Sequence, residues 1–178
     1  MNKNITVFCS ASNDIDDIYI NEAKKVALCL GQKGYNLIYG GDKVGLMGVI
    51  SESMKKTGAE IYGVCIKEMY DKGKYYPYCH SIEIVESLAK RKEIMINKSN
   101  ILLILPGGIG TINELLEVLV MIQLKLISKK KIIIFNINSF FTNFLKYLNE
   151  LNEKNFLRDE YINLYQIVNN VDELSNVI

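Results

Sequence analysis

The sequence predicts an α/β protein built on a parallel sheet with helices on both faces. Short apolar runs rich in β-branched residues alternate along its 178 residues with longer segments whose apolar side chains recur at helical spacing. One run, residues 100–105, is apolar almost without interruption, as expected for a central strand that helices cover on both faces. Three expected strands end in small or glycine-rich turns. No repeat or linker interrupts the pattern, so we expect one doubly wound domain over residues 1–178.

Glycines mark the ends of the expected elements in the amino-terminal half. A β-branched run opens the chain and ends in the small residues 10–12. The first helix ends before Gly34 and the second before Gly58, since glycine commonly terminates helices. Gly40 and Gly41 end the second strand. We expect strands at 5–9, 35–39 and 60–65 and helices at 19–33 and 44–57.

The carboxy-terminal half continues the alternation after a polar, aromatic segment. Residues 67–80 include Pro77 and are expected to form a loop. Phe140, Phe141 and Phe144 share one expected helix and could face either the core or a partner subunit. We expect strands at 82–85, 100–105, 131–137 and 164–168, helices at 88–98, 111–127 and 140–154, and a closing segment at 171–178.

Charge and motif content exclude several classes of function. Twenty-one Lys and Arg residues face twenty Asp and Glu, a formal net charge of +1, so no broad field favours nucleic acid or a membrane surface. His80 is the only histidine, and no zinc-finger or paired-histidine motif is present. We therefore expect a small-molecule partner, with no nucleic acid, membrane, metal or cofactor.

The expected compartment is the cytoplasm. The four cysteines show neither a CxxC pair nor zinc-finger spacing. The first four residues are polar and the apolar run 5–8 is too short for a secretory leader. No stretch approaches the length of a membrane span. These features predict a reduced, soluble protein.

The strongest functional signal is the segment PGGIGTINE at residues 106–114, which joins the uninterrupted apolar run to the long helix. Gly107, Gly108 and Gly110 allow a ligand to approach closely and can point successive backbone N–H groups toward it. The helix N-terminus that follows favours phosphate. Thr111 can cap that helix or bond a phosphate oxygen. The alternative is a tight strand-to-helix turn, for which one glycine would suffice.

This segment matches neither of the familiar phosphate-binding motifs. No Lys follows Gly110, so GxxxxGK[ST] is absent. The dinucleotide motif GxGxxG would follow the first strand, where the chain has Ser10-Ala11-Ser12. The residues therefore argue against a P-loop NTPase and an NAD enzyme. A second glycine-rich turn, residues 40–48, either packs a helix closely or contributes to the same anion or sugar site.

Charged and aromatic residues near these turns are candidate site residues, each with a structural alternative. Glu114 follows Thr111 by three residues, where a carboxylate can complete a capping box or orient water or a sugar hydroxyl. Arg91 is one of two arginines, in a basic run that is either a solvated face or a bidentate anion site. The tyrosine-rich stretch 75–78 could stack on a base, cover a core edge or contact a second subunit.

Taken together, these motifs resemble the Lonely Guy family, the cytokinin riboside 5′-monophosphate phosphoribohydrolases often misnamed lysine decarboxylases. PGGIGTINE matches the family signature PGGxGTxxE. The order and spacing of further residues also match, and the resemblance covers nearly the whole chain. These residues are Val7–Ser12, Tyr39–Gly41, Gly45–Gly48, Arg91, Lys92 and Gln123.

The resemblance implies a Rossmann-like homodimer that cleaves the N-glycosidic bond of a nucleoside 5′-monophosphate and releases the base and ribose 5-phosphate. The family's essential Arg and Glu fall on Arg91 and Glu114. Nothing in the residues supports a decarboxylase that uses pyridoxal phosphate. The family's substrate-binding positions fall on Ser12, Gly41, Arg91, Lys92, Gly107, Gly108, Gly110 and Thr111.

Two alternative functions, neither of them catalytic, also fit these motifs. One is a molybdenum-cofactor carrier of the same superfamily, which would bind a phosphorylated pterin. The other is an interaction module whose glycine loop senses a nucleotide. The presence of both Arg91 and Glu114 favours the enzyme, because a carrier does not need the pair. A cytokinin riboside monophosphate and AMP are both candidate substrates.

Overall fold

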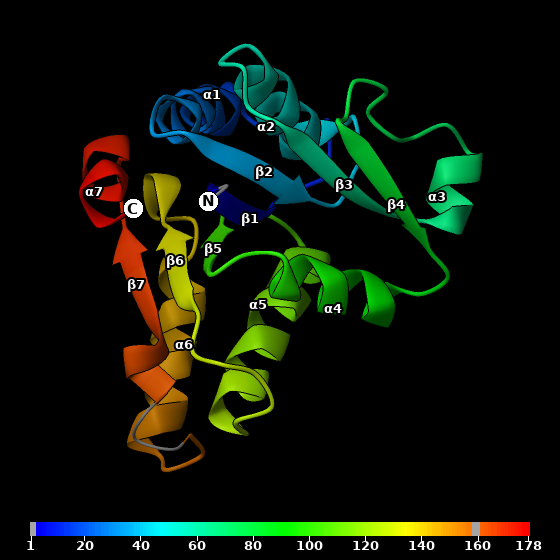
Figure 1. Ribbon diagram of the computed structural model, residues 1–178. Helices are drawn as coiled ribbons and strands as arrows, with labels where there is room; N and C mark the ends of the chain where they lie inside the picture. Colours follow the sequence, from blue (N-terminus) through cyan, green and yellow to red (C-terminus); the bar gives the residue numbers. More distant parts are fainter. Residues whose placement is uncertain (1–2, 158–160) are drawn as a thin grey trace.

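A seven-stranded parallel sheet is the centre of the structure, a computed structural model that describes residues 3–157 and 161–178 (Figure 1). The strands are β1 (Lys3–Phe8), β2 (Tyr35–Tyr39), β3 (Ile61–Ile66), β4 (Ser81–Val85), β5 (Ile101–Ile104), β6 (Lys131–Phe135) and β7 (Tyr165–Val168). Their order is β4-β3-β2-β1-β5-β6-β7, and all adjacent pairs are parallel. The expected doubly wound α/β fold is confirmed.

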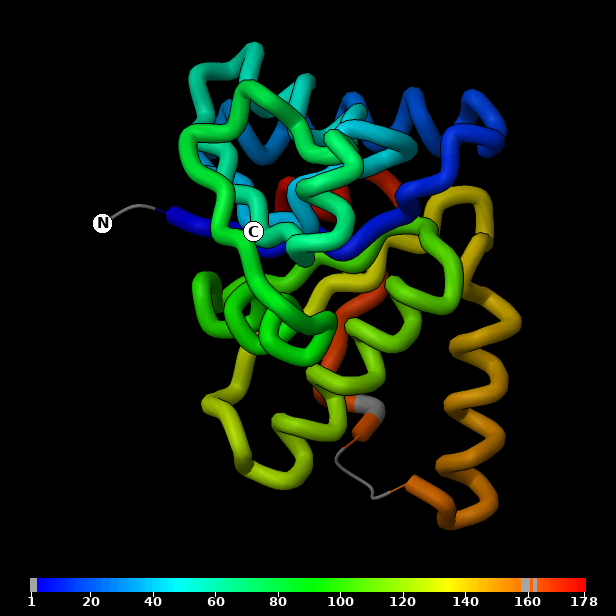
Figure 2. The backbone as a smooth tube through the Cα atoms, turned by 90° about the vertical axis from the view of Figure 1, so that its right-hand side faces the viewer, coloured from blue at the N-terminus to red at the C-terminus, as the bar shows by residue number. Residues whose placement is uncertain are grey.

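Helices cover both faces of this sheet. They are α1 (Asp17–Gln32), α2 (Gly45–Lys55), α3 (Lys67–Asp71), α4 (Leu88–Asn97), α5 (Ile109–Gln123), α6 (Thr142–Glu153) and α7 (Val171–Val177), with short 3₁₀ turns at Ile137–Ser139 and Tyr161–Leu164. Buried side chains of α1, α2 and α7 pack against one face, and those of α4, α5 and α6 against the other. Figure 2 shows α1 and α2 on one side of the sheet and α4, α5 and α6 on the other.

The uninterrupted apolar run is the central strand that the sequence predicts. Leu103 packs into the core layer of α1 and α2, whereas Leu102 and Ile104 pack into the layer of α4 and α5. All three side chains are fully buried. Because successive side chains of a strand point to opposite faces, only a strand covered on both sides can bury every residue of such a run.

Most expected elements agree with the structure to within two residues at each end, and the larger differences fall in two segments. The segment 67–80 is not only a loop, because α3 occupies its first five residues, where Lys67 pairs with Asp71 one helical turn away. The helix expected at 111–127 begins at Ile109 and ends at Gln123. Lys125 adopts a left-handed conformation with φ of 58°. The apolar residues beyond the helix end extended the periodicity, but Leu124 and Leu126 are exposed, and Ile127 packs partly buried against the core.

The strand order places a crevice at the carboxyl end of β1. The chain builds from β1 through β2 to β4 on one side, and from β5 to β7 on the other. The loops that leave β1 and β5 therefore run in opposite directions. In sheets of this kind, ligands bind in the crevice between such diverging loops.

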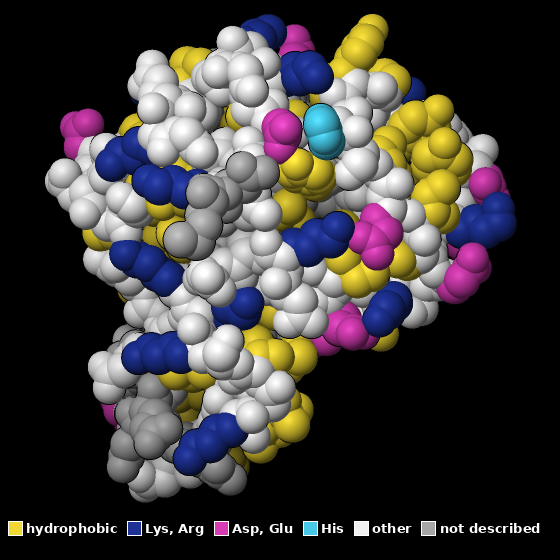
Figure 3. All heavy atoms as spheres, in the orientation of Figure 1, with side chains coloured by type: hydrophobic (Ala, Val, Ile, Leu, Met, Phe, Trp, Pro, Cys, Tyr) yellow, Lys and Arg dark blue, Asp and Glu magenta, His cyan; other side chains and the backbone are white. Residues whose placement is uncertain are grey.

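The surface adds little to the functional argument. On the face shown in Figure 3, Lys and Arg side chains are scattered rather than gathered into one patch. Within the described ranges, no helix is long and apolar enough to cross a membrane.

Candidate active site

The turns after β1 and β5 and the start of α2 meet at the crevice, as the sequence predicts. Ser10 lies at their junction. Its backbone N–H donates to the Pro106 carbonyl at 3.0 Å, and its own carbonyl accepts from the Met47 N–H at 3.3 Å. The backbone N–H of Gly45 donates to the Asn13 side chain at 2.9 Å, which ties the start of α2 to the loop after β1.

The glycine loop presents an uncapped helix N-terminus. Gly108 is the N-cap of α5, and no side chain caps the helix. The first bond of the helix runs from the Ile112 N–H to the Gly108 carbonyl at 3.1 Å. The N–H groups of Ile109, Gly110 and Thr111 therefore have no acceptor within the helix. Together with the positive end of the helix dipole, they suit an anion such as phosphate.

The glycines of this loop serve two different purposes. A Cβ atom at Gly107 would lie 2.1 Å from the Thr111 hydroxyl and 3.1 Å from the Ser10 nitrogen, so Gly107 allows close packing. At Gly108 and Gly110 a Cβ atom would have no neighbour within 4 Å. These two positions therefore leave open space in front of the helix, where a ligand can lie.

Thr111 is not the helix cap that the sequence allowed. It is the third residue of α5, because the helix begins at Ile109 after Gly108. Its side chain is buried against Gly107. The capping-box alternative for Glu114 is also wrong, because that box requires Ser or Thr at the N-cap position and Gly108 occupies it.

Glu114 instead faces Arg91 across the gap between α5 and α4. Arg91 Nη1 lies 3.3 Å from Glu114 Oε1, and the two side chains are only 14% and 11% exposed. Arg91 Nε donates to the Val64 carbonyl at 2.9 Å. A Cβ atom at Gly40 would lie 1.7 Å from Arg91 Nη2, so this glycine is needed to admit the guanidinium. The structure thus brings together the two residues that the sequence singled out.

Burial makes Glu114 an unusual carboxyl group. Desolvation raises its pKa to about 7, although Arg91 and Lys92 lower it. Cys9 lies close by, directly after β1, and burial raises the pKa of its thiol, with the charge of Glu114 raising it further. Cys9 is therefore a neutral neighbour. Glu114 can exchange a proton near neutral pH, as an acid–base group must.

The raised pKa of Glu114 predicts a pH-dependent cost to stability. The folded protein holds this proton more tightly than the unfolded chain, so between pH 4.5, the ordinary pKa of Glu, and about pH 7 its contribution lowers the free energy of unfolding as pH rises. The full cost above that range is roughly 3 kcal/mol. We expect Glu114→Gln to lose little at pH 5 and to be more stable than the wild type at pH 8, in urea unfolding. Parallel pH dependences of the two proteins would contradict this.

Lys92 lies beside the pair but is engaged by other groups. Its ammonium pairs with Glu117 and donates to Asn113 Oδ1 at 2.7 Å. These contacts join α4 to α5. Ser12 lies in the loop after β1, and its hydroxyl accepts from the Asp14 N–H at 3.3 Å. Gly41 adopts φ of 80°, a left-handed conformation that favours glycine.

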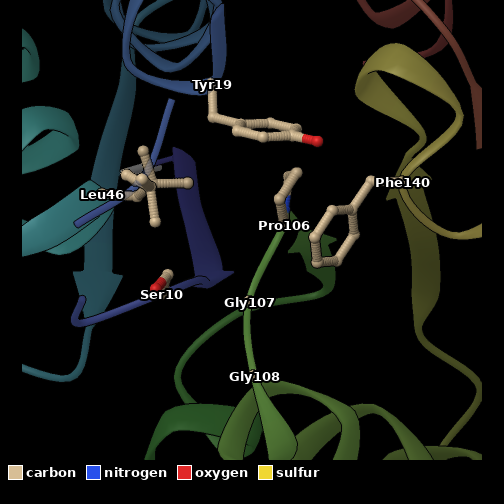
Figure 4. Close-up of a pocket in the computed structure, with 8 residues that line it drawn as sticks. Ser10, Tyr19, Leu46, Pro106, Gly107, Gly108 and Phe140 are labelled. Carbon is tan, nitrogen blue, oxygen red and sulfur yellow. The ribbon is translucent and has the colours of Figure 1, made fainter. Parts of the chain in front are cut away.

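Two cavities open on this end of the sheet. One, of about 180 Å³, adjoins Gly107 and Gly108 and has mainly apolar walls that include Tyr19, Leu46 and Phe140 (Figure 4). The other, of about 170 Å³, has Arg91 in its wall. Sequence reasoning did not single out Asp42, which also lines the second cavity. Its position one residue after the glycine pair was the only available signal.

The tyrosines of the stretch 75–78 lie outside both cavities, whereas one of the three phenylalanines lines a cavity wall. Tyr75 stacks on Tyr70 with ring centroids 4.4 Å apart, and Tyr76 and Tyr78 form an edge-to-face pair. None of these rings lines either cavity. Phe141 is buried in the core, whereas Phe140 is half-exposed and lines the cavity of Figure 4. Across the described ranges, no cluster of three or more His, Cys, Asp or Glu side chains could hold a metal ion.

Comparison with protein families gives one match over most of the chain. A family model described as "possible lysine decarboxylase" matches residues 47–178. An Arabidopsis thaliana protein named cytokinin riboside 5′-monophosphate phosphoribohydrolase is 28% identical over 97% of this chain and 75% of its own length. A second Arabidopsis thaliana protein, named a probable enzyme of the same activity, is 31% identical over 87% of this chain and 77% of its own length.

Solved structures share the fold at lower identity. The molybdenum cofactor binding protein of Rippkaea orientalis superposes with a TM-score of 0.75, over 99% of this chain and 95% of its own. Its sequence is 16% identical to this chain, so the likeness concerns the fold alone.

Proposed function

Because the chain belongs to the Lonely Guy family, we propose that it is a nucleoside 5′-monophosphate phosphoribohydrolase. The proposed reaction hydrolyses the N-glycosidic bond and releases the free base and ribose 5-phosphate. The names of its relatives support this class of reaction. The observation that carries the proposal is the buried Arg91–Glu114 pair, which lies one helical turn beyond the open N-terminus of α5.

The substrate phosphate is proposed to bind at the glycine loop. The open space over Gly108 and Gly110 admits the phosphate oxygens, and the unpaired N–H groups at the start of α5 donate to them. Ser12, in the loop after β1, and Gly41, after β2, are proposed to contact the substrate as well. An anchored phosphate holds the ribose in place, so that binding energy remote from the reacting bond assists the chemistry.

Glu114 is proposed to act on the glycosidic carbon. As the C1′–N bond breaks, the base leaves with the bonding electrons and positive charge develops on the ribose. The Glu114 carboxylate stabilises this charge and accepts a proton from the attacking water, whose oxygen bonds to C1′. The released base takes up the proton that Glu114 accepted, which restores the carboxylate. A group whose pKa is about 7 is suited to this exchange.

Arg91 is proposed to hold the Glu114 carboxylate and to contact the ribose or phosphate. Its bond to the Val64 carbonyl fixes the guanidinium while leaving other N–H groups available. The charge of Lys92 adds to that of Arg91 in favouring the ionised carboxyl group. We propose that the enzyme works as a cytoplasmic homodimer, without metal or cofactor.

A turnover panel tests the function. Purified protein is incubated with AMP, isopentenyladenosine 5′-monophosphate, GMP, CMP and the matching nucleosides, and free base and ribose 5-phosphate are measured. Release from monophosphates but not from nucleosides is the expected result, because only the former engage the loop. Nucleotide binding without release from any of them would contradict the enzyme and favour a carrier or sensor.

Substitution of Gly110 tests the place of the phosphate. Ala at this position has open space and no strained backbone, so we expect Gly110→Ala to keep the melting temperature of the wild type or to raise it slightly. The added methyl group occupies the space proposed for phosphate, and we expect at least about tenfold weaker AMP binding in calorimetry. Gly58→Ala, at a helix end outside the crevice, is the control for binding and is measured well below its melting temperature, because Gly58 has a φ of 85° that strains Ala. Unchanged AMP affinity in Gly110→Ala would place the phosphate elsewhere.

A further inference from the structure

The cavity beside Arg91 is the place for the base, if the proposed function holds. With the phosphate at the start of α5 and the glycosidic bond at Arg91 and Glu114, the base lies on the far side of that bond. The cavity that begins there has Arg91 in its wall and is otherwise lined largely by apolar side chains, including Met47, Met69 and Leu88. Such walls suit a flat heteroaromatic ring. The cavity of Figure 4 contains neither Arg91 nor Glu114.

Asp42 is the one carboxylate among the described residues that line this cavity. Its backbone is held by its neighbours, because the Lys43 N–H donates to the Lys74 carbonyl at 3.0 Å and the Tyr76 N–H to the Gly41 carbonyl at 2.8 Å. The effect of its charge reaches Cys65 in the same wall. Burial raises the pKa of that thiol, Arg91 lowers it and Asp42 raises it.

One oxygen of Asp42 remains open to a ligand. Oδ1 accepts from the Val44 N–H at 3.3 Å, and Oδ2 makes no hydrogen bond to any residue described in the structure. Within the same described residues, no Lys, Arg or His forms an ion pair with Asp42. An ionised carboxylate only accepts hydrogen bonds, and a half-buried acceptor in an apolar cavity favours a ligand that brings a donor.

We propose that Asp42 is the residue that recognises the base, by accepting an N–H from its 6-amino group. A 6-oxo group places a carbonyl oxygen against the carboxylate and is rejected. An adenine with one substituent on N6 keeps an N–H and is accepted, and one with two substituents is not.

A series of nucleotide analogues tests this selection in the wild-type protein. We expect kcat/KM for AMP to exceed that for purine riboside 5′-monophosphate, which lacks the amino group, by about 10- to 100-fold. IMP and N6,N6-dimethyl-AMP should be as poor or poorer, and N6-methyl-AMP should resemble AMP. Equal values for AMP, purine riboside 5′-monophosphate and IMP would overturn the inference.

The substitution Asp42→Asn tests the residue itself. An amide can turn its NH₂ group toward a 6-oxo base, so we expect the ratio of kcat/KM for AMP over IMP to fall by at least about tenfold. Asp71→Asn is the matched control, because it removes an acidic group from nearby α3 that pairs with Lys67 and does not line the cavity. This control should keep the wild-type ratio. An unchanged ratio in Asp42→Asn would remove Asp42 from recognition.

Failure of this inference is distinguishable from failure of the proposed function. If no nucleotide is hydrolysed, the preference among AMP, IMP and purine riboside 5′-monophosphate is measured by calorimetry, as ratios of dissociation constants instead of ratios of kcat/KM. Preference for AMP in binding without turnover would support base recognition by Asp42 and contradict the proposed hydrolase activity. Turnover without a preference for AMP would support the hydrolase activity and contradict base recognition by Asp42.

Discussion

Replacing Glu114 with Gln is expected to lower kcat by about a thousandfold or more, while nucleotide affinity changes by no more than about threefold. Gln has nearly the same shape and keeps an oxygen that can accept from Arg91 Nη1, which lies 3.3 Å from Oε1 in the wild type. It can neither accept a proton from water nor place negative charge beside the ribose. The rate is measured by release of base from saturating AMP, and affinity by calorimetry.

The matched control for this variant is Glu117→Gln, one helical turn further along α5. Glu117 faces Lys92 and is more exposed than Glu114, so it has no place at the glycosidic bond. We expect its kcat to stay within about tenfold of the wild type, because the charge of Lys92 near Glu114 is retained. Turnover by Glu114→Gln at the wild-type rate would remove Glu114 from the mechanism.

The fold and the location of the crevice follow from local patterns in the sequence. The unbroken apolar run from Leu102 to Ile104 predicted a central strand buried on both faces of the sheet, and these side chains are fully buried in the structure. Glycines at positions 34 and 58 marked helix ends correctly, since both adopt positive φ beyond α1 and α2. Carboxyl ends of parallel strands share one edge, so turns far apart in the chain had to meet there.

Contacts across the crevice could not be read from local patterns. The sequence left open whether Arg91 belonged to a solvated face and whether Glu114 was a cap. Their roles depend on a contact between α4 and α5 and on the Val64 carbonyl of β3, which have no signature in spacing. Likewise, Gly40 resembled a turn residue, yet its lack of a side chain admits the Arg91 guanidinium. These roles depend on contacts between residues that are far apart in the sequence.

Substitution of Arg91 separates the two contributions of the guanidinium, charge and shape. The Glu114 carboxylate is the proposed active form, so kcat/KM of the wild type should rise with pH through a midpoint near 7. Arg91 lowers the pKa of Glu114 against the effect of burial. We therefore expect Arg91→Met to move the midpoint to higher pH and to lower the plateau by about a hundredfold or more.

Arg91→Lys is the informative partner of that variant. Lys keeps the positive charge, so the midpoint should stay closer to that of the wild type than in Arg91→Met. A single ammonium cannot donate to the Val64 carbonyl and to Glu114 with the fixed geometry of the guanidinium, so the plateau should remain low. Full recovery of the rate in Arg91→Lys would mean that charge alone matters. A plateau that stays low while the midpoint returns would show that Arg91 must hold the carboxylate in place as well as attract it.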